Sequence, residues 1–244
     1  MLNQNSFSEG ELMPQNNAKV DPFIIKDCTL IAIATGKRAG NLRELRALLQ
    51  DIDLGCIYYH FWGGLLRARF DDPEYHNDFS LWVRHALYDK VLAERLSLID
   101  PTNFPDLESL KQELLEIMEE RLDEIDYSPN APRDHQFEFI RSQIVIFTTK
   151  NTVKKPQDFA KILPHMSVGS IFFHFIDARR RNPEALDDFS NWLRNFGQKY
   201  NDLGDLVKEI DPYFSSLTGL RNELTHSFRT FFNNSKTPQR DRSL

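Results

Sequence analysis

The sequence predicts an α+β fold that is predominantly α-helical and built from two repeats related by a pseudo-twofold axis, each a short strand followed by several helices. The main observation is an internal match, because the heptapeptide 55–61 (GCIYYHF) returns 114 positions later as 169–175 (GSIFFHF). A short apolar run also precedes several amphipathic segments in each copy. Two copies of one unit most simply fold as two like halves.

The match extends over most of the chain and sets the expected boundaries. Residues 78–84 (DFSLWVR) align with 188–194 (DFSNWLR), an offset of 110 that follows a four-residue deletion. We therefore expect repeat 1 over 22–126, a proline-containing linker over 127–136 and repeat 2 over 137–232. Residues 1–21 and 233–244 are polar, and we expect them to be disordered tails.

The first elements of each repeat follow from length and periodicity. Apolar residues over 28–34 and over 137–149 suit one buried strand per repeat. Leucines at 42, 45, 48 and 49 predict a helix, with a counterpart over 159–163 after Pro156. The segments around Ile57 and Ile171 are compatible with strand or helix, and helix is favoured because Ser167 suits an N-cap.

Two further helices are expected in the rest of each repeat. Asn77 or Asp78, and in the second copy Asp187 or Asp188, are N-cap candidates for a helix with an aromatic stripe. Asp106 begins a long helix whose outer face is acidic, which fits a solvated face better than a docking surface.

Composition excludes several classes of protein. The 244 residues include 41% hydrophobic residues and carry a net charge of −6, which disfavours broad binding to nucleic acid. No apolar run is long enough to cross a membrane, and the N-terminus lacks a secretory pattern. Two cysteines are too few for a disulfide framework. We expect a cytoplasmic protein.

Polar residues that recur in both copies are the first candidates for a ligand site. On a helix, His60 and Arg67 share one side, as do His174 and Arg181, and each pair could bind an anion. The recurring arginines Arg84 and Arg194 join this candidate set. The alternative is that the imidazoles are core residues, hydrogen-bonded to backbone or to a charged residue of the next helix, and that the arginines pair with nearby carboxylates.

A second candidate occurs in one copy only. Arg221, Asn222 and His226 form a pattern that resembles the R-N-x-x-x-H motif of HEPN helical domains, many of which are ribonucleases. The resemblance implies metal-independent RNA cleavage in a cleft between two chains. The first repeat has Lys111 and Glu116 at the matching positions, so such a site would need a homodimer. The structural alternative is a surface arginine and histidine near a helix C-terminus.

Other chemistries have no support in the sequence. Phosphate-loop, dinucleotide-binding, nucleophile-elbow and H-E-x-x-H motifs do not occur. His85, His135 and His165 lack a second ligand at metal-like spacing. We therefore expect no metal and no cofactor.

A broader resemblance covers residues 22–228. The pattern S-I-x-F-H, followed by D-F-x-x-W-h-R (h, apolar), is similar to a prokaryotic family known only as a domain of unknown function; Cys56 replaces the serine in the first copy. The resemblance implies a soluble protein that acts with partners. Our leading hypothesis is a non-enzymatic binding or regulatory module for an anionic small molecule or a partner protein. The alternative is the HEPN-like homodimeric ribonuclease.

Overall fold

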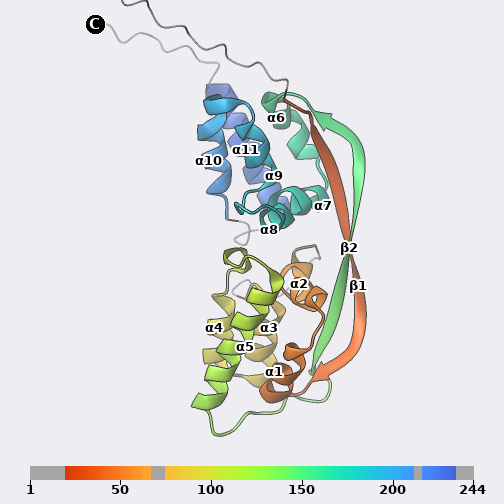
Figure 1. The fold of residues 1–244 in the computed structure, drawn as a ribbon, viewed down its shortest axis with the longest axis vertical. Coiled ribbons are helices and arrows are strands. Elements are labelled where there is room, and N and C mark those ends of the chain that lie inside the picture. Colours follow the sequence, from red (N-terminus) through yellow and green to blue (C-terminus); the bar gives the residue numbers. More distant parts are fainter. Residues whose placement is uncertain (1–19, 67–74, 212–215, 235–244) are drawn as a thin grey trace, which may run out of the picture.

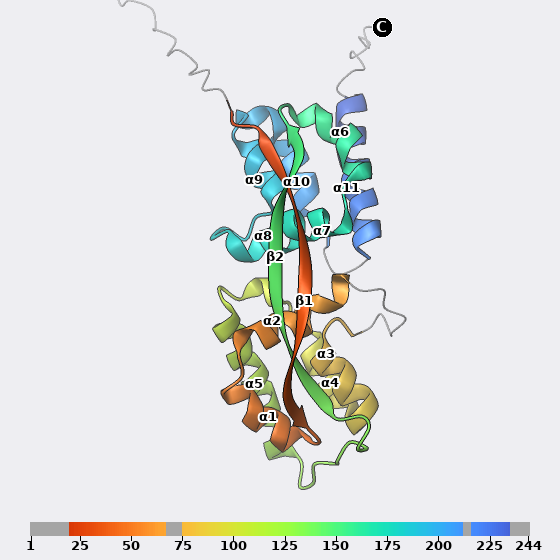
Figure 2. The ribbon, with the colours of Figure 1, turned by 90° about the vertical axis from the view of Figure 1, so that its right-hand side faces the viewer.

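A long two-stranded antiparallel ribbon runs along one side of the protein, and two helical bundles stack along it (Figure 1). The structure is a computed structural model that describes residues 20–66, 75–211 and 216–234. Helices α1–α5 form the first bundle and α6–α11 the second. Figure 2 shows the ribbon crossing both bundles. The prediction of a predominantly helical α+β fold is confirmed.

The ribbon consists of β1 (Phe23–Ala39) and β2 (Phe137–Val153). Leu30 pairs with Ile144 at its centre, and these two residues are themselves 114 positions apart. The register shifts near each end, between Ile24 and Lys26 and between Ala34 and Arg38. The pairing is therefore the same when read from either end.

The register shifts are stabilised by equivalent threonines. Thr35 Oγ1 donates to the Phe139 carbonyl at 2.6 Å, and Thr149 Oγ1 donates to the Ile25 carbonyl at 2.7 Å. These threonines satisfy backbone carbonyls where the regular ladder is interrupted. Each strand can then continue well beyond the seven residues that the apolar run over 28–34 predicts.

The first bundle follows β1. It contains α1 (Leu42–Gln50), α2 (Leu54–Trp62), α3 (Asp78–Trp82), α4 (Lys90–Ser97) and α5 (Leu107–Glu124). Helix α3 continues into a π-helical turn over Val83–Leu87. The expected cap of α5 is present, because the Asp106 carboxylate accepts a hydrogen bond from Ser109 N at 2.8 Å.

The second bundle follows β2. Its helices are α6 (Phe159–Ile162), α7 (Val168–Ile171), α8 (Ala178–Arg181), α9 (Asp188–Arg194), α10 (Asn201–Lys208) and α11 (Leu217–Asn234). A π-helical segment, Phe172–Asp177, joins α7 to α8. Ser167 caps α7 as predicted, accepting a hydrogen bond from Ser170 N at 2.9 Å. Helix α11 extends to Asn234, beyond the expected end of repeat 2.

Each strand begins on the bundle of the other repeat. Phe23, at the start of β1, stacks on Phe189 of the second bundle with ring centroids 5.4 Å apart. Phe137, at the start of β2, stacks on Phe79 of the first bundle at 5.0 Å. The two bundles therefore exchange strands, and neither could keep its present core without the other's strand.

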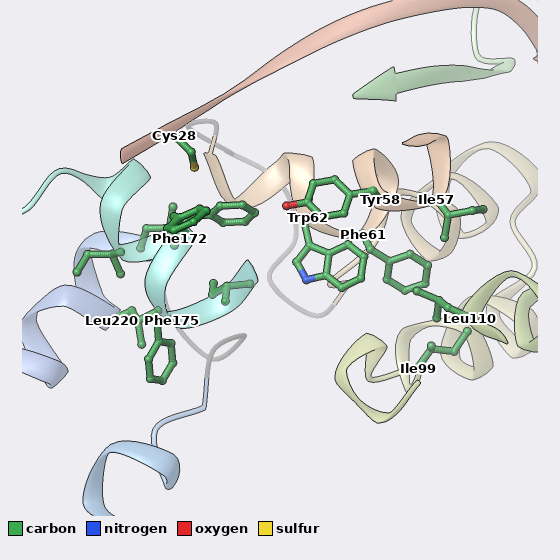
Figure 3. Close-up of a cluster of buried hydrophobic side chains, with 14 of the residues drawn as sticks. Cys28, Ile57, Tyr58, Phe61, Trp62, Ile99, Leu110, Phe172, Phe175 and Leu220 are labelled. Atoms are coloured by element: carbon green, nitrogen blue, oxygen red, sulfur yellow. The ribbon is translucent and has the colours of Figure 1, made fainter. Parts of the chain in front are cut away.

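The core is continuous between the bundles. In the view of Figure 3, Tyr58 and Trp62 of α2 lie beside Phe172 of the second bundle, and all three belong to one buried cluster. The Tyr58 hydroxyl donates to the Asp177 carboxylate at 3.0 Å. Burial, followed by the adjacent Asp177 charge, raises the pKa of Tyr58, so the phenol stays a hydrogen-bond donor.

The tandem duplication and the disordered tails remain predictions. Positions related by the repeat make the same contacts along the ribbon, although the tandem duplication itself remains an inference from sequence. Most of the predicted tails, 1–21 and 233–244, lies outside the described residues. Among the helices of the described ranges, none has the length and apolar character needed to cross a membrane.

Candidate functional site: two histidine clamps and a pocket

His174 is buried, with 3% of its surface exposed, and joins the second bundle to β1. Its Nε2 accepts a hydrogen bond from the Lys26 backbone N–H at 2.9 Å. Its Nδ1 lies 2.7 Å from Oδ2 of Asp188. Because a backbone N–H can only donate, Nε2 must carry the lone pair, and in the neutral ring Nδ1–H then donates to the carboxylate. Both ring nitrogens are hydrogen-bonded, and we call this arrangement of His174, Lys26 N and Asp188 the His174 clamp.

His60 makes the equivalent clamp between the first bundle and β2. It is also 3% exposed, and its Nε2 accepts a hydrogen bond from Ile140 N at 3.2 Å. Its Nδ1 lies 2.9 Å from Oδ2 of Asp78. Lys26 and Ile140 are related by the same 114-residue offset as the two histidines. The geometry matches the core alternative for these histidines, and their predicted role in ligand binding remains untested.

Of the N-cap candidates, Asn77 and Asp187 are confirmed, whereas Asp78 and Asp188 are not the caps. The N-caps are the preceding residues, since Asn77 accepts a hydrogen bond from Ser80 N at 2.9 Å and Asp187 accepts one from Ser190 N at 2.8 Å. Burial raises the pKa of Asp187. Asp78 and Asp188 occupy the first helical position instead, where their carboxylates face the histidines.

Arg181 lies beside His174, as the helical spacing predicts, but it binds carboxylates of the protein itself. Its Nε donates to Asp177 at 2.8 Å, and one Nη lies 3.2 Å from Asp188. The guanidinium also covers the Phe173 ring at 4.1 Å. Its counterpart in the first repeat, Arg67, lies outside the described residues.

The other two predicted arginines lie away from the clamps. Arg194 pairs with a carboxylate of the protein, that of Glu184. Arg84 is half-buried on the π turn after α3 and does not line the pocket beside that turn.

A pocket of about 640 Å³ opens beside the His60 clamp. It lies between α2, the α3 segment and the start of β2. Its wall combines aromatic and aliphatic surface with imidazoles, and it is formed by Tyr59, His60, Asp78, Leu81, Trp82, His85, Ala86, His135, Gln136, Phe137, Glu138 and Ile140. Apolar walls with a few polar groups at this volume are typical of small-molecule sites.

Two of the positions that line this pocket carry different residues in the second bundle. Ala86 aligns with Phe196, whose ring packs against Trp192 at 4.7 Å. His85 aligns with Asn195. The His60 and His174 clamps are alike, whereas the space beside them is lined differently.

The HEPN-like residues lie on α11. Arg221 is half-buried and donates through Nη1 to the Met166 carbonyl at 2.9 Å, while Asn222 and His226 are exposed. Lys111, the counterpart of Arg221 in the first bundle, similarly reaches the Gln50 carbonyl at 3.4 Å. Both cations thus bind a backbone carbonyl near the end of a preceding helical segment, which is a structural role.

Comparison with known proteins places the chain in a family. A family model described as a family of unknown function (DUF5752) matches residues 20–229. The chain belongs to this family. A similar solved structure is that of OrfY from Thermoproteus tenax, with a TM-score of 0.73 and 27% sequence identity. The similarity covers 86% of this chain and 95% of the OrfY chain. No curated protein matches significantly.

Sequence reasoning did not find the pocket. Trp82 and Phe137 were expected only as core or strand residues, and His85 and His135 were considered only as metal ligands. The sequence does contain one sign of the pocket, because the two repeats differ there: His85 and Ala86 align with Asn195 and Phe196. Within the described ranges, no group of three or more His, Cys, Asp or Glu side chains could hold a metal ion.

Proposed function

We propose that this member of the DUF5752 family is a non-enzymatic binding and regulatory module, and that the pocket beside His60 holds its small-molecule ligand. The supporting observation is a pocket of about 640 Å³ in the first bundle, at positions where the second bundle carries Phe196 in place of Ala86 and Asn195 in place of His85. Because both bundles have the histidine clamp, the pocket is not a by-product of building the clamp.

The lining defines the chemistry of the ligand. Trp82 and Phe137 offer aromatic surface, and their rings are already in edge-to-face contact at 5.6 Å. The two carboxylates at the pocket have partners, since Asp78 binds His60 and Glu138 binds Arg38 at 2.8 Å. His85 and His135 supply further hydrogen-bonding groups at the pocket. A ligand with a flat apolar body and an anionic or acceptor group fits best.

The position of the pocket supports a regulatory role. Its wall includes Phe137 and Ile140, at the start of β2, and the same strand continues to the second bundle. If this strand can adopt two placements, a ligand that binds the protein more tightly in one placement shifts the equilibrium towards that placement. Occupancy in the first bundle would then be sensed by the second bundle through the ribbon.

Mass spectrometry of natively purified protein tests this proposal. We expect a copurifying small molecule, lost in Ala86→Phe, which places the second bundle's side chain in the pocket. The matched control is Ala47→Phe on α1, where residue 47 is exposed. Loss of the small molecule in Ala86→Phe alone, with the melting temperature kept, supports the pocket. Retention of the same molecule in Ala86→Phe contradicts it.

The ribonuclease alternative requires His226 to act on RNA that lies in a cleft between two chains. The exposure of Asn222 and His226 on α11 is compatible with such a cleft, while Arg221 would have to exchange the Met166 carbonyl for RNA. RNA cleavage by the purified homodimer that disappears in His226→Ala would favour this alternative. Purified protein without nuclease activity would eliminate it.

A further inference from the structure

A second and larger hollow, of about 1040 Å³, lies at the outer end of the second bundle. It is bounded by the segment around α6, the turn before α10 and the last turns of α11, which lie together in Figure 1. We call it the cationic groove. It is lined by Gln157, Asp158, Ala160, Lys161, His165, Lys199, Tyr200, Arg229, Phe231, Phe232 and Asn233.

Positive charge dominates the rim of the cationic groove. Lys161, Lys199 and Arg229 are exposed there, and the His165 imidazole is a further polar group. Among the described residues of the lining, Asp158 alone carries a negative charge. This concentration of cations contrasts with the net charge of −6 of the whole chain. A cationic groove raises the local concentration of anions.

An aromatic group lies beside these cations. Tyr200 is within 6.1 Å of Phe231 and 6.0 Å of Phe232, measured between ring centroids, and the two phenylalanines are 5.2 Å apart. Phe231 and Phe232 are only partly buried, so they contribute ring surface to the groove. Cations next to exposed rings are the combination by which proteins hold phosphate and base together.

The equivalent positions in the first bundle form ion pairs within the protein. Helices α5 and α11 have the same length and correspond at an offset of 110. In the first bundle Arg46 pairs with Glu119, and Arg121 donates to Asp89 at 2.8 Å. These ion pairs tie the end of α5 to α1 and to the N-cap of α4.

The second bundle replaces both ion pairs. Arg46 and Glu119 align with Ala160 and Arg229, and Arg121 aligns with Phe231. Arg229 uses its Nε to donate to the Ala160 carbonyl at 3.2 Å, which leaves its terminal guanidinium nitrogens at the groove. The acidic partners are thus removed while cations and rings are added at the groove.

We propose that the cationic groove binds a nucleotide unit, with the phosphate on Lys161, Lys199 and Arg229 and the base on the rings of Phe231 and Phe232. The unit comes from a free nucleotide or from single-stranded RNA, which present the same phosphate and base. The volume accommodates a ligand of this size. The groove is separate from the pocket beside His60, and the proposal does not depend on that pocket.

Binding of ATP and of a fluorescent decaadenylate to the full chain tests the proposal, by calorimetry and by anisotropy. The diagnostic variants are Lys199→Glu and Arg229→Glu, with Lys161→Glu as a third. Lys90→Glu, at an exposed lysine of the first bundle, is the matched charge control. Phe232→Ala tests the contribution of the rings, and Ala86→Phe separates this groove from the other pocket.

We expect each diagnostic charge reversal to weaken binding by tenfold or more, and the affinity to fall as salt rises because phosphate contacts release counterions. Phe232→Ala should weaken binding by about tenfold through lost stacking. Lys90→Glu and Ala86→Phe should bind like the parent. Preference for ATP identifies a free nucleotide, and preference for decaadenylate identifies RNA.

Three results would overturn the proposal. The first is no binding of either probe at physiological salt. The second is equal weakening in Lys90→Glu and Arg229→Glu, which would mean a general charge effect. The third is inorganic phosphate competing as well as ATP while Phe232→Ala binds normally, because the groove would then be a simple anion site without base recognition.

Discussion

Replacing His174 by alanine should destabilise the protein strongly, because this side chain attaches β1 to the second bundle. The imidazole accepts a hydrogen bond from Lys26 N at 2.9 Å and binds Asp188 at 2.7 Å. It also packs against Phe23, with ring centroids 4.7 Å apart. The substitution removes all three interactions and leaves the Lys26 N–H without its acceptor.

The magnitude follows from these contacts. The backbone hydrogen bond contributes about 1 kcal/mol, and the bond to Asp188 contributes roughly the same because that carboxylate is partly exposed and therefore screened. Loss of the buried ring adds about 1–2 kcal/mol. The total is about 3–4 kcal/mol, which in a protein of this size lowers the melting temperature by on the order of 10 °C.

Calorimetry or circular dichroism measures the shift, and hydrogen exchange locates it. Exchange at the Lys26 amide should accelerate more than exchange elsewhere in β1. His174→Gln should lose less stability, since its amide oxygen can still accept from Lys26. His165→Ala, at an exposed histidine of the same bundle, should change the free energy of unfolding by less than about 0.5 kcal/mol. A His174→Ala protein with the same melting temperature as the parent would refute the stabilising role of the His174 clamp.

Other predictions concern glycine packing and the thiols. A β-carbon on Gly169 would lie 2.3 Å from the Asp27 carboxylate and from the Cys28 carbonyl, so Gly169→Ala should cost about 1–3 kcal/mol in chemical denaturation. The control Gly204→Ala has open space in α10 and should stabilise the protein by about 0.5–1 kcal/mol. Burial raises the pKa of Cys28 to about 12 and of Cys56 to about 11, so iodoacetamide at pH 8 should label both only after unfolding. Because the unfolded thiols ionise near pH 9, stability should fall as pH rises from about 9 towards these values, and unchanged unfolding free energy over that range would contradict the shifts.

The sequence predicted the helices better than the ribbon. The periodic leucines predicted α1 and Asp106 predicted the start of α5, because a helix is specified by local spacing and capping. The strands were expected over 28–34 and 137–149, yet β1 extends over Phe23–Ala39 and β2 over Phe137–Val153. Their ends are polar or bulged, and Thr35 and Thr149 stabilise the bulges through contacts with the partner strand. Such cross-strand contacts leave no local periodicity.

The sequence also identified which polar residues matter without showing how they are arranged. Recurrence of His60 and His174 indicated two equivalent roles, and the core alternative named both kinds of partner that the structure has. The exchange of strands between the bundles could not be predicted, because a repeat does not say which copy's strand covers which helices. For the same reason, nothing in the sequence connected His174 with Lys26.

The contrast between the two bundles is the best guide to function within this chain. Features that both bundles have, such as the histidine clamps, are buried and satisfied by internal partners, so the fold alone accounts for them. The differences line the two hollows, where Ala86 of the pocket aligns with Phe196 and Arg229 of the cationic groove aligns with Glu119. If recognition depended on the shared residues, the two bundles would offer two like sites. The observed differences instead give one bundle an aromatic pocket with imidazoles and the other a cationic groove, and the β-ribbon connects the two bundles.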